Sequence, residues 1–138
     1  MNLTEVKVDM IKYNSFKEKA KVCLNNLKGT ITNFLQDIIK IEESEELVIH
    51  FIYMGRRFET RAEIPIGVKD LKKIQISTYV DPEDRIKDYV FVFSYPIDEL
   101  GMINVKYTED NFSEYYLEEM LPQAKNKLFE LGKPIVIK

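Results

Sequence analysis

The first apolar residues of the chain fit two kinds of secondary structure. Over residues 3–11, apolar and charged residues alternate as they do in a half-buried strand. The same segment also places apolar residues three and four positions apart, as one face of a helix requires. These residues are Leu3, Val6, Met10 and Tyr13. The pattern therefore leaves the element type of this segment open.

From residue 16 onward, the apolar residues fit only the spacing of a helix. This spacing predicts a helix over about 16–28, preceded by a capping-box sequence that begins at Ser15. A second helix is predicted from Thr30 until the acidic run that follows Ile41. Gly29 separates the two, because a glycine readily takes the left-handed conformation that ends a helix. A single helix through Gly29 is the alternative, at a cost of about 1 kcal/mol.

The clearest hairpin of the sequence covers residues 47–64. Polar and apolar residues alternate along 57–64, and Gly55 with Arg56 predicts a two-residue turn that joins this strand to residues 47–54. The pairing that follows places Tyr53 opposite Phe58 on the side that faces the core. Charged residues of the second strand then lie together on the other side.

The rest of the chain predicts further strands and one long helix. Strands are expected over 71–80 and 89–95, with a short fifth strand over 102–107. A C-terminal helix follows from about residue 112, with apolar residues at regular helical spacing. Pro122 lies inside it and should kink the helix or split it in two, because proline lacks a backbone N–H.

These elements predict one α+β domain over residues 1–138. Its antiparallel sheet has about four to six strands, packed with two N-terminal helices and a long C-terminal helix kinked or split near Pro122. The order of elements resembles that of helix-grip ligand-binding folds and of secretion-chaperone-like folds. This likeness concerns the fold alone and carries little weight for function.

Two strands carry apolar residues on both of their sides. Strands of this kind belong in the middle of a sheet whose two faces are both covered. Their surplus apolar surface would form an interface with another protein or line a ligand cavity. The residues concerned are Val48, Ile52 and Met54 around the first hairpin strand, and Tyr89, Phe91, Phe93 and Tyr95 in the later strand.

One group of polar residues has a definite geometry on the hairpin. Two or three guanidinium groups beside a histidine could hold a carboxylate or a phosphate, since arginine presents paired donors. The favoured interpretation is a solvated strand face whose charges pair with one another. The candidate binding residues are His50, Arg56, Arg57, Glu59 and Arg61, with Glu63 beside them.

The amino-acid composition argues against several kinds of functional site. The chain has one cysteine, Cys23, and one histidine, His50, so it lacks the ligands of a structural zinc site. Its five glycines are scattered and form neither a P-loop nor a dinucleotide-binding motif. We expect no catalytic residues, no metal and no cofactor. A phosphate-processing enzyme that uses the acidic residues of segment 81–84 ranks third among the functions considered.

Net charge and cysteine content indicate which partners and which cellular compartment to expect. A net charge of -3 and a pI near 5.3 disfavour a nucleic-acid partner. No apolar run is long enough to enter a membrane, and a single cysteine favours the reducing cytoplasm.

We therefore expect a small cytoplasmic, non-catalytic protein-binding module that contacts another protein or a second copy of itself. The alternative is a small-molecule-binding or helix-grip-like domain with an aromatic-lined cavity and an anionic ligand near Arg57 and Arg61.

Overall fold

Two helices and one sheet make up the computed structural model, which describes residues 2–65, 71–85, 87–98 and 111–137. The sheet is antiparallel, and its strands follow one another in chain order. This arrangement confirms the α+β fold class and the antiparallel sheet. The helices are α1 (Leu3–Phe34) and α2 (Phe112–Glu130), and the strands are β1 (Ile39–Ile41), β2 (Val48–Tyr53), β3 (Arg56–Glu63), β4 (Lys73–Val80) and β5 (Val90–Asp98).

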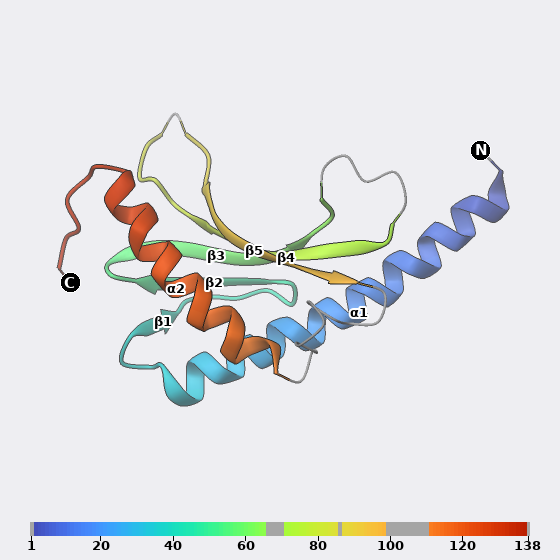
Figure 1. Cartoon of the computed structure of the whole chain (residues 1–138), viewed down its shortest axis with the longest axis horizontal. Helices are drawn as coiled ribbons and strands as arrows, with labels where there is room; N and C mark the ends of the chain where they lie inside the picture. The colour runs from blue at the N-terminus through green and yellow to red at the C-terminus, as the bar shows by residue number, and fades with distance from the viewer. Residues whose placement is uncertain (1, 66–70, 86, 99–110, 138) are drawn as a thin grey trace.

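Both helices lie against the same face of the sheet (Figure 1). α2 packs on β5 and on α1, while α1 reaches β1, β2 and β4. Side chains such as Phe51, Phe58 and Ile76 are fully buried between the sheet and the helices. Within the parts of the chain that the structure describes, no helix covers the other face. The arrangement therefore differs from the expected sheet with two covered faces.

α1 is one continuous helix of 32 residues, and the prediction of two N-terminal helices is wrong. Residues 3–11, whose type the sequence left open, form its first turns. The side-chain oxygen of Asn2 caps the helix by accepting a hydrogen bond from the Glu5 backbone N–H at 2.9 Å. Gly29 does not end the helix, because the burial of Leu27 and Ile31 on either side outweighs its cost of about 1 kcal/mol.

The end of α1 also differs from the expected position. The helix stops at Phe34, and residues 39–41, expected to be helical, form β1 and pair with β2. Ile39 is buried in this strand, so its apolar side chain serves the sheet rather than a helix face.

Replacing Gly29 with alanine is expected to raise the free energy of unfolding by about 1 kcal/mol, because alanine favours a helix interior. The position is open, with no atom within 4 Å of the added Cβ. Gly132→Ala is the control, because Gly132 has a φ of +69° and an added side chain there should cost about 1 kcal/mol. Urea unfolding measures both changes. A loss of stability in Gly29→Ala would contradict a continuous α1.

The hairpin turn is formed by Met54 and Gly55, one residue earlier than predicted. Both have positive φ, 51° and 72°, as a two-residue primed turn requires. Tyr53 therefore pairs with Arg56, and Phe51 stacks on Phe58 with ring centroids 5.3 Å apart. The pairing differs from the prediction by two residues, and an even shift leaves every side chain on its predicted face.

α2 is a single helix from residue 112 to residue 130, so Pro122 does not split it into two helices. Pro122 and Glu118 are both exposed, so water can reach the Glu118 carbonyl that the missing N–H leaves without a partner. The helix tolerates the proline for this reason. The strand predicted over 102–107 lies outside the described residues.

Candidate functional site

All of the predicted charged residues except Arg56 lie on the uncovered face of the sheet. Arg61 donates to Glu59 at 2.8 Å and to Glu63 at 3.2 Å. Its guanidinium also stacks over the ring of Tyr79 at 4.1 Å, and the Tyr79 hydroxyl donates to Glu63. Partial burial and the bond to Glu63 raise the pKa of Tyr79 above its ordinary value. His50 lies beside this group, with its Nδ1 3.8 Å from the Glu59 carboxylate.

The three neighbouring arginines do not converge on one point. Arg57 shares the uncovered face and pairs with Glu42 at 3.2 Å. Arg56 lies on the opposite, covered face and is 2% exposed, because its pairing in the hairpin turns it inward. There it donates to the Asp81 carbonyl at 3.3 Å, and its Nε is 3.4 Å from the Glu83 carboxylate. Each guanidinium thus has a carboxylate nearby, which supports a charge-paired surface more than an anion site.

A β-bulge divides the predicted row of aromatic residues in β5. Thr78 pairs with Phe93 and Tyr79 pairs with Phe91, which leaves Val92 as the extra residue. Phe93 therefore stays on the covered face, whereas Phe91 turns to the uncovered face. Phe91 is 50% exposed there and meets Tyr79 edge to face at 5.8 Å.

The other predicted apolar residues are spread over several positions. Val48 and Ile52 are half-buried on the uncovered face, and Met54 is in the hairpin turn. Tyr89 is partly buried just before β5. They do not form one surface with Phe93 and Tyr95.

The covered aromatic residues pack against α2. The ring of Tyr116 lies 5.3 Å from Phe93 and 6.0 Å from Tyr95, and Tyr116 is fully buried. Its hydroxyl bonds the Thr78 hydroxyl at 2.6 Å, and Thr78 bonds the Thr60 hydroxyl at 2.7 Å. These rings fill the place where a ligand cavity was considered.

The buried Tyr116 phenol predicts a loss of stability at high pH. Burial raises its pKa above the ordinary value of 10.0, so the folded protein keeps a proton that the unfolded chain loses. This stabilising contribution is complete below pH 10 and declines by up to about 1.4 kcal/mol per pH unit above it. Tyr116→Phe should remove that part of the decline. Urea unfolding at about pH 9 and about pH 11 compares the two proteins, and equal declines would contradict the prediction.

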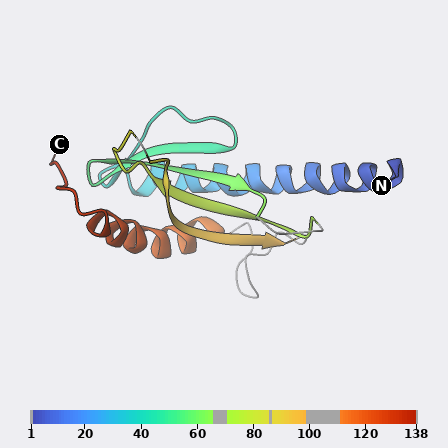
Figure 2. The ribbon, with the colours of Figure 1, turned by 90° about the horizontal axis from the view of Figure 1, so that it is seen from above.

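The N-terminal part of α1 extends past the end of the sheet (Figures 1 and 2). We call residues 3–15 the arm. Large apolar side chains are exposed along it, by 39% to 78% of their surface. They are Leu3, Val6, Val8, Met10, Ile11 and Tyr13.

One apolar stripe runs from the arm into the core. Within each half its members are three or four residues apart, as in helices that pack lengthwise on a partner, and Lys17 stands between the two halves. In the second half of α1 the stripe is buried by the sheet and α2, whereas in the arm it is exposed. The stripe consists of Leu3, Val6, Met10 and Tyr13 in the arm and Ala20, Leu24, Leu27 and Ile31 in the core.

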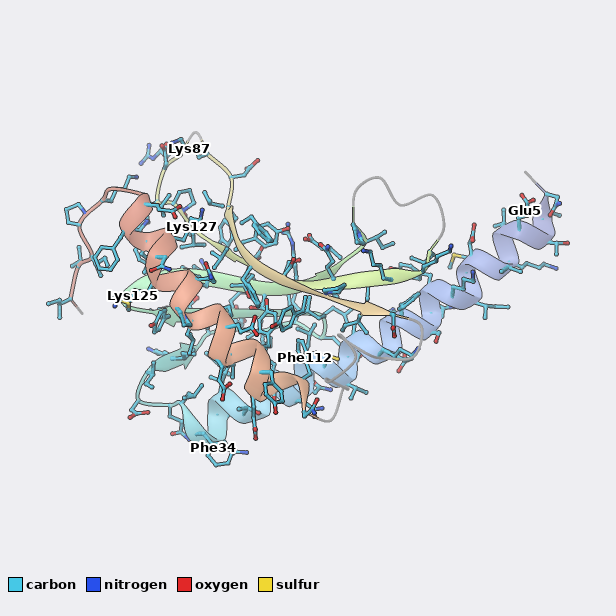
Figure 3. The ribbon with its side chains drawn as sticks, viewed as in Figure 1. Glu5, Phe34, Lys87, Phe112, Lys125 and Lys127 are labelled. Carbon is cyan, nitrogen blue, oxygen red and sulfur yellow. The ribbon has the colours of Figure 1, made fainter. Side chains whose placement is uncertain are left out.

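A groove lies at the other end of α1, where that helix meets α2. It has a volume of about 360 Å³, and its floor is apolar. The hydroxyls of Thr30 and Ser113 bond at 2.8 Å and join the two helices beside it. Phe34 is 76% exposed at its edge and sits at the opposite end of α1 from Glu5 of the arm (Figure 3). The groove is lined by Thr30, Phe34, Leu35, Glu114, Leu117, Glu118 and Leu121.

Sequence patterns did not identify the arm or the groove as candidate sites. The helical spacing of Leu3, Val6, Met10 and Tyr13 was the available signal for the arm. Phe34 lies inside the predicted second helix, whereas in the structure α1 ends at this residue and leaves it exposed.

Neither a metal site nor a membrane-spanning helix is present among the described residues. Among the described residues, no three His, Cys, Asp or Glu side chains are placed to hold a metal ion. Neither of the two described helices has the length and apolar character needed to cross a membrane. The chain matches no protein-family model, no curated protein and no solved structure.

Proposed function

We propose that this chain is a small, non-catalytic protein-binding module whose contact surface is the arm. The exposed apolar stripe of the arm is the observation that supports this most strongly. Burying one such side chain against a partner is worth about 1.5–3 kcal/mol. The arm also exposes Val8 and Ile11 away from the stripe, and a helix with apolar residues on several sides is usually buried in an assembly.

The length of the arm supports the same proposal. An isolated helix shorter than about 12–15 residues is only marginally stable in water. The arm lacks sheet contacts along its exposed side and depends on the rest of α1 for its helical form. A partner that covers the stripe would stabilise both the helix and the complex.

The small-molecule alternative has less support. It depends on Phe93 and Tyr95 lining a cavity, and their rings instead pack against Tyr116. The uncovered sheet face is a weaker contact surface than the arm, because its arginines are already close to carboxylates. Cys23 is buried and is the one cysteine of the chain, so it cannot form a disulfide within it, which suits the proposed cytoplasmic setting.

Affinity capture from the native lysate, with three tagged forms of the full chain, tests the proposal. The forms are the wild type, an arm variant with Val6→Glu and Met10→Glu, and a control with Gln123→Glu and Asn126→Glu. The control adds the same charge at exposed positions of α2, outside the arm and the groove. A differently tagged copy of the chain is included so that self-association is detected.

We expect one protein, either this chain or another, to be retained by the wild type and the control and to be lost by the arm variant. Circular dichroism confirms that all three forms are folded. Equal recovery from the three forms, or recovery of no protein by any of them, would contradict the proposal.

A further inference from the structure

We infer that the arm binds a second copy of this chain, in a two-fold dimer where each arm lies in the groove between α1 and α2 of its partner. This inference rests on the proposed function and names the partner of the same surface. Both halves of the required contact, an apolar helix and an apolar groove, are present on one chain. A single symmetric interface would cover both.

The positions of the arm and the groove suit a two-fold axis. They lie at opposite ends of α1, which is straight enough in both views to place them far apart (Figures 1 and 2). If two α1 helices run antiparallel about their midpoint, Leu3 of one copy is level with Phe34 of the other. The arm of each copy then meets the groove of the other at the same time, and the assembly closes as a dimer.

Charge favours the same arrangement. The groove carries Glu114 and Glu118 on its rim, and neither forms an ion pair with a described residue. The arm carries Lys7 beside Val6 and Met10 of its stripe, and Lys7 also lacks an ion pair with the described part of the chain. Opposite charges around an apolar contact fix orientation and disfavour other partners.

Every copy contributes both surfaces to the contact. The stripe presents four arm residues and the groove is lined by seven, so each copy offers at least 11 residues. Phe34, a large exposed aromatic residue at the edge of the groove, is of the type that contributes strongly to such interfaces.

Cysteine cross-linking of the full-length protein tests the arrangement. The double variant with Leu3→Cys and Phe34→Cys should form a disulfide-linked dimer under mild oxidation in dilute solution. Neither single variant should do so, because residues 3 of the two copies would lie about 47 Å apart, as would residues 34. A second double variant, Leu3→Cys with Val22→Cys, is the control and should stay unlinked. All three positions are exposed, so the fold should be retained.

Sedimentation equilibrium of the wild type and of the Val6→Glu, Met10→Glu variant completes the test. We expect a dimer for the wild type and at least a 100-fold weaker association for the variant. Cross-linking of Leu3→Cys alone would overturn the inference, because the two arms would then lie side by side. A wild-type protein that remains a monomer would overturn it as well.

The two proposals fail separately. If the wild type is a monomer and the arm variant still loses a captured protein, the partner is another protein and only the dimer is wrong. If capture does not depend on the arm either, the proposed function is also wrong.

Discussion

Replacing Phe58 with alanine is expected to lower the free energy of unfolding by about 3–5 kcal/mol, the usual cost of removing a buried aromatic ring. Phe58 is fully buried under the helices and stacks on Phe51, with Tyr53 at 6.1 Å. The surrounding strands are paired on both sides and can close only part of the space left behind. Denaturant unfolding, followed by circular dichroism, measures the loss.

Phe91→Ala is the matched control for the uncovered face of the sheet. Phe91 is an aromatic residue of the same size in a neighbouring part of the sheet, but half of its surface is exposed. Its replacement should cost no more than about 1 kcal/mol. If Phe91→Ala cost as much as Phe58→Ala, the face described as uncovered would have to be buried.

Thr78→Val is expected to cost about 2–3 kcal/mol with little change in shape. The Thr78 hydroxyl stands between the hydroxyls of Thr60 and Tyr116, and all three residues are fully buried. Valine would leave both neighbours without this partner, and each buried polar group left unpaired costs about 1–3 kcal/mol. The Tyr116 hydroxyl retains only a long contact of 3.5 Å to the Phe93 carbonyl. Urea unfolding at neutral pH measures the change.

A double-mutant cycle with Tyr116→Phe tests whether the three hydroxyls act together. In the Thr78→Val protein, Tyr116→Phe removes a hydroxyl that has already lost its partner, so it should cost less than in the wild type. Equal costs in both proteins would show that the bond between Thr78 and Tyr116 contributes nothing to stability.

Local patterns predicted most strands because alternation and turn residues act over a few positions. They placed β2 to β4 within two residues of their positions and assigned the hairpin faces correctly. The predicted strand register was wrong because Met54 adopts a positive φ, whereas the prediction started the turn at Gly55. A methionine in this conformation is uncommon, so its presence in the turn could not be seen from residue type.

The long helix was misjudged for a different reason. Gly29 has a local tendency to end a helix, but tertiary burial on both sides of it carries α1 onward. Pro122 is tolerated inside α2 for another reason, because Glu118 is exposed and water can reach its unpaired carbonyl. The packing around Gly29 and the exposure of Glu118 both depend on the whole fold, which a local pattern does not contain.

The candidate site depended even more on tertiary structure. The pattern grouped Tyr89, Phe91, Phe93 and Tyr95, yet the extra residue Val92 separates Phe91 from Phe93 and Tyr95. The pattern also showed the helical spacing of the arm, but not that the sheet ends before the arm does. Exposure of a regular apolar stripe depends on the whole fold. This exposure is the observation that most strongly supports the proposed protein-binding function.

Amide hydrogen exchange of residues 3–15, in the associated and the free protein, tests most directly whether the arm is a protein-contact surface. Free arm amides should exchange rapidly, because little holds this part of α1 in place. On association with the second copy or with a captured partner, we expect their exchange to slow at least tenfold, and the Val6→Glu, Met10→Glu variant should show no slowing. Association that protects other segments and leaves these amides exchanging at the free rate would contradict the account.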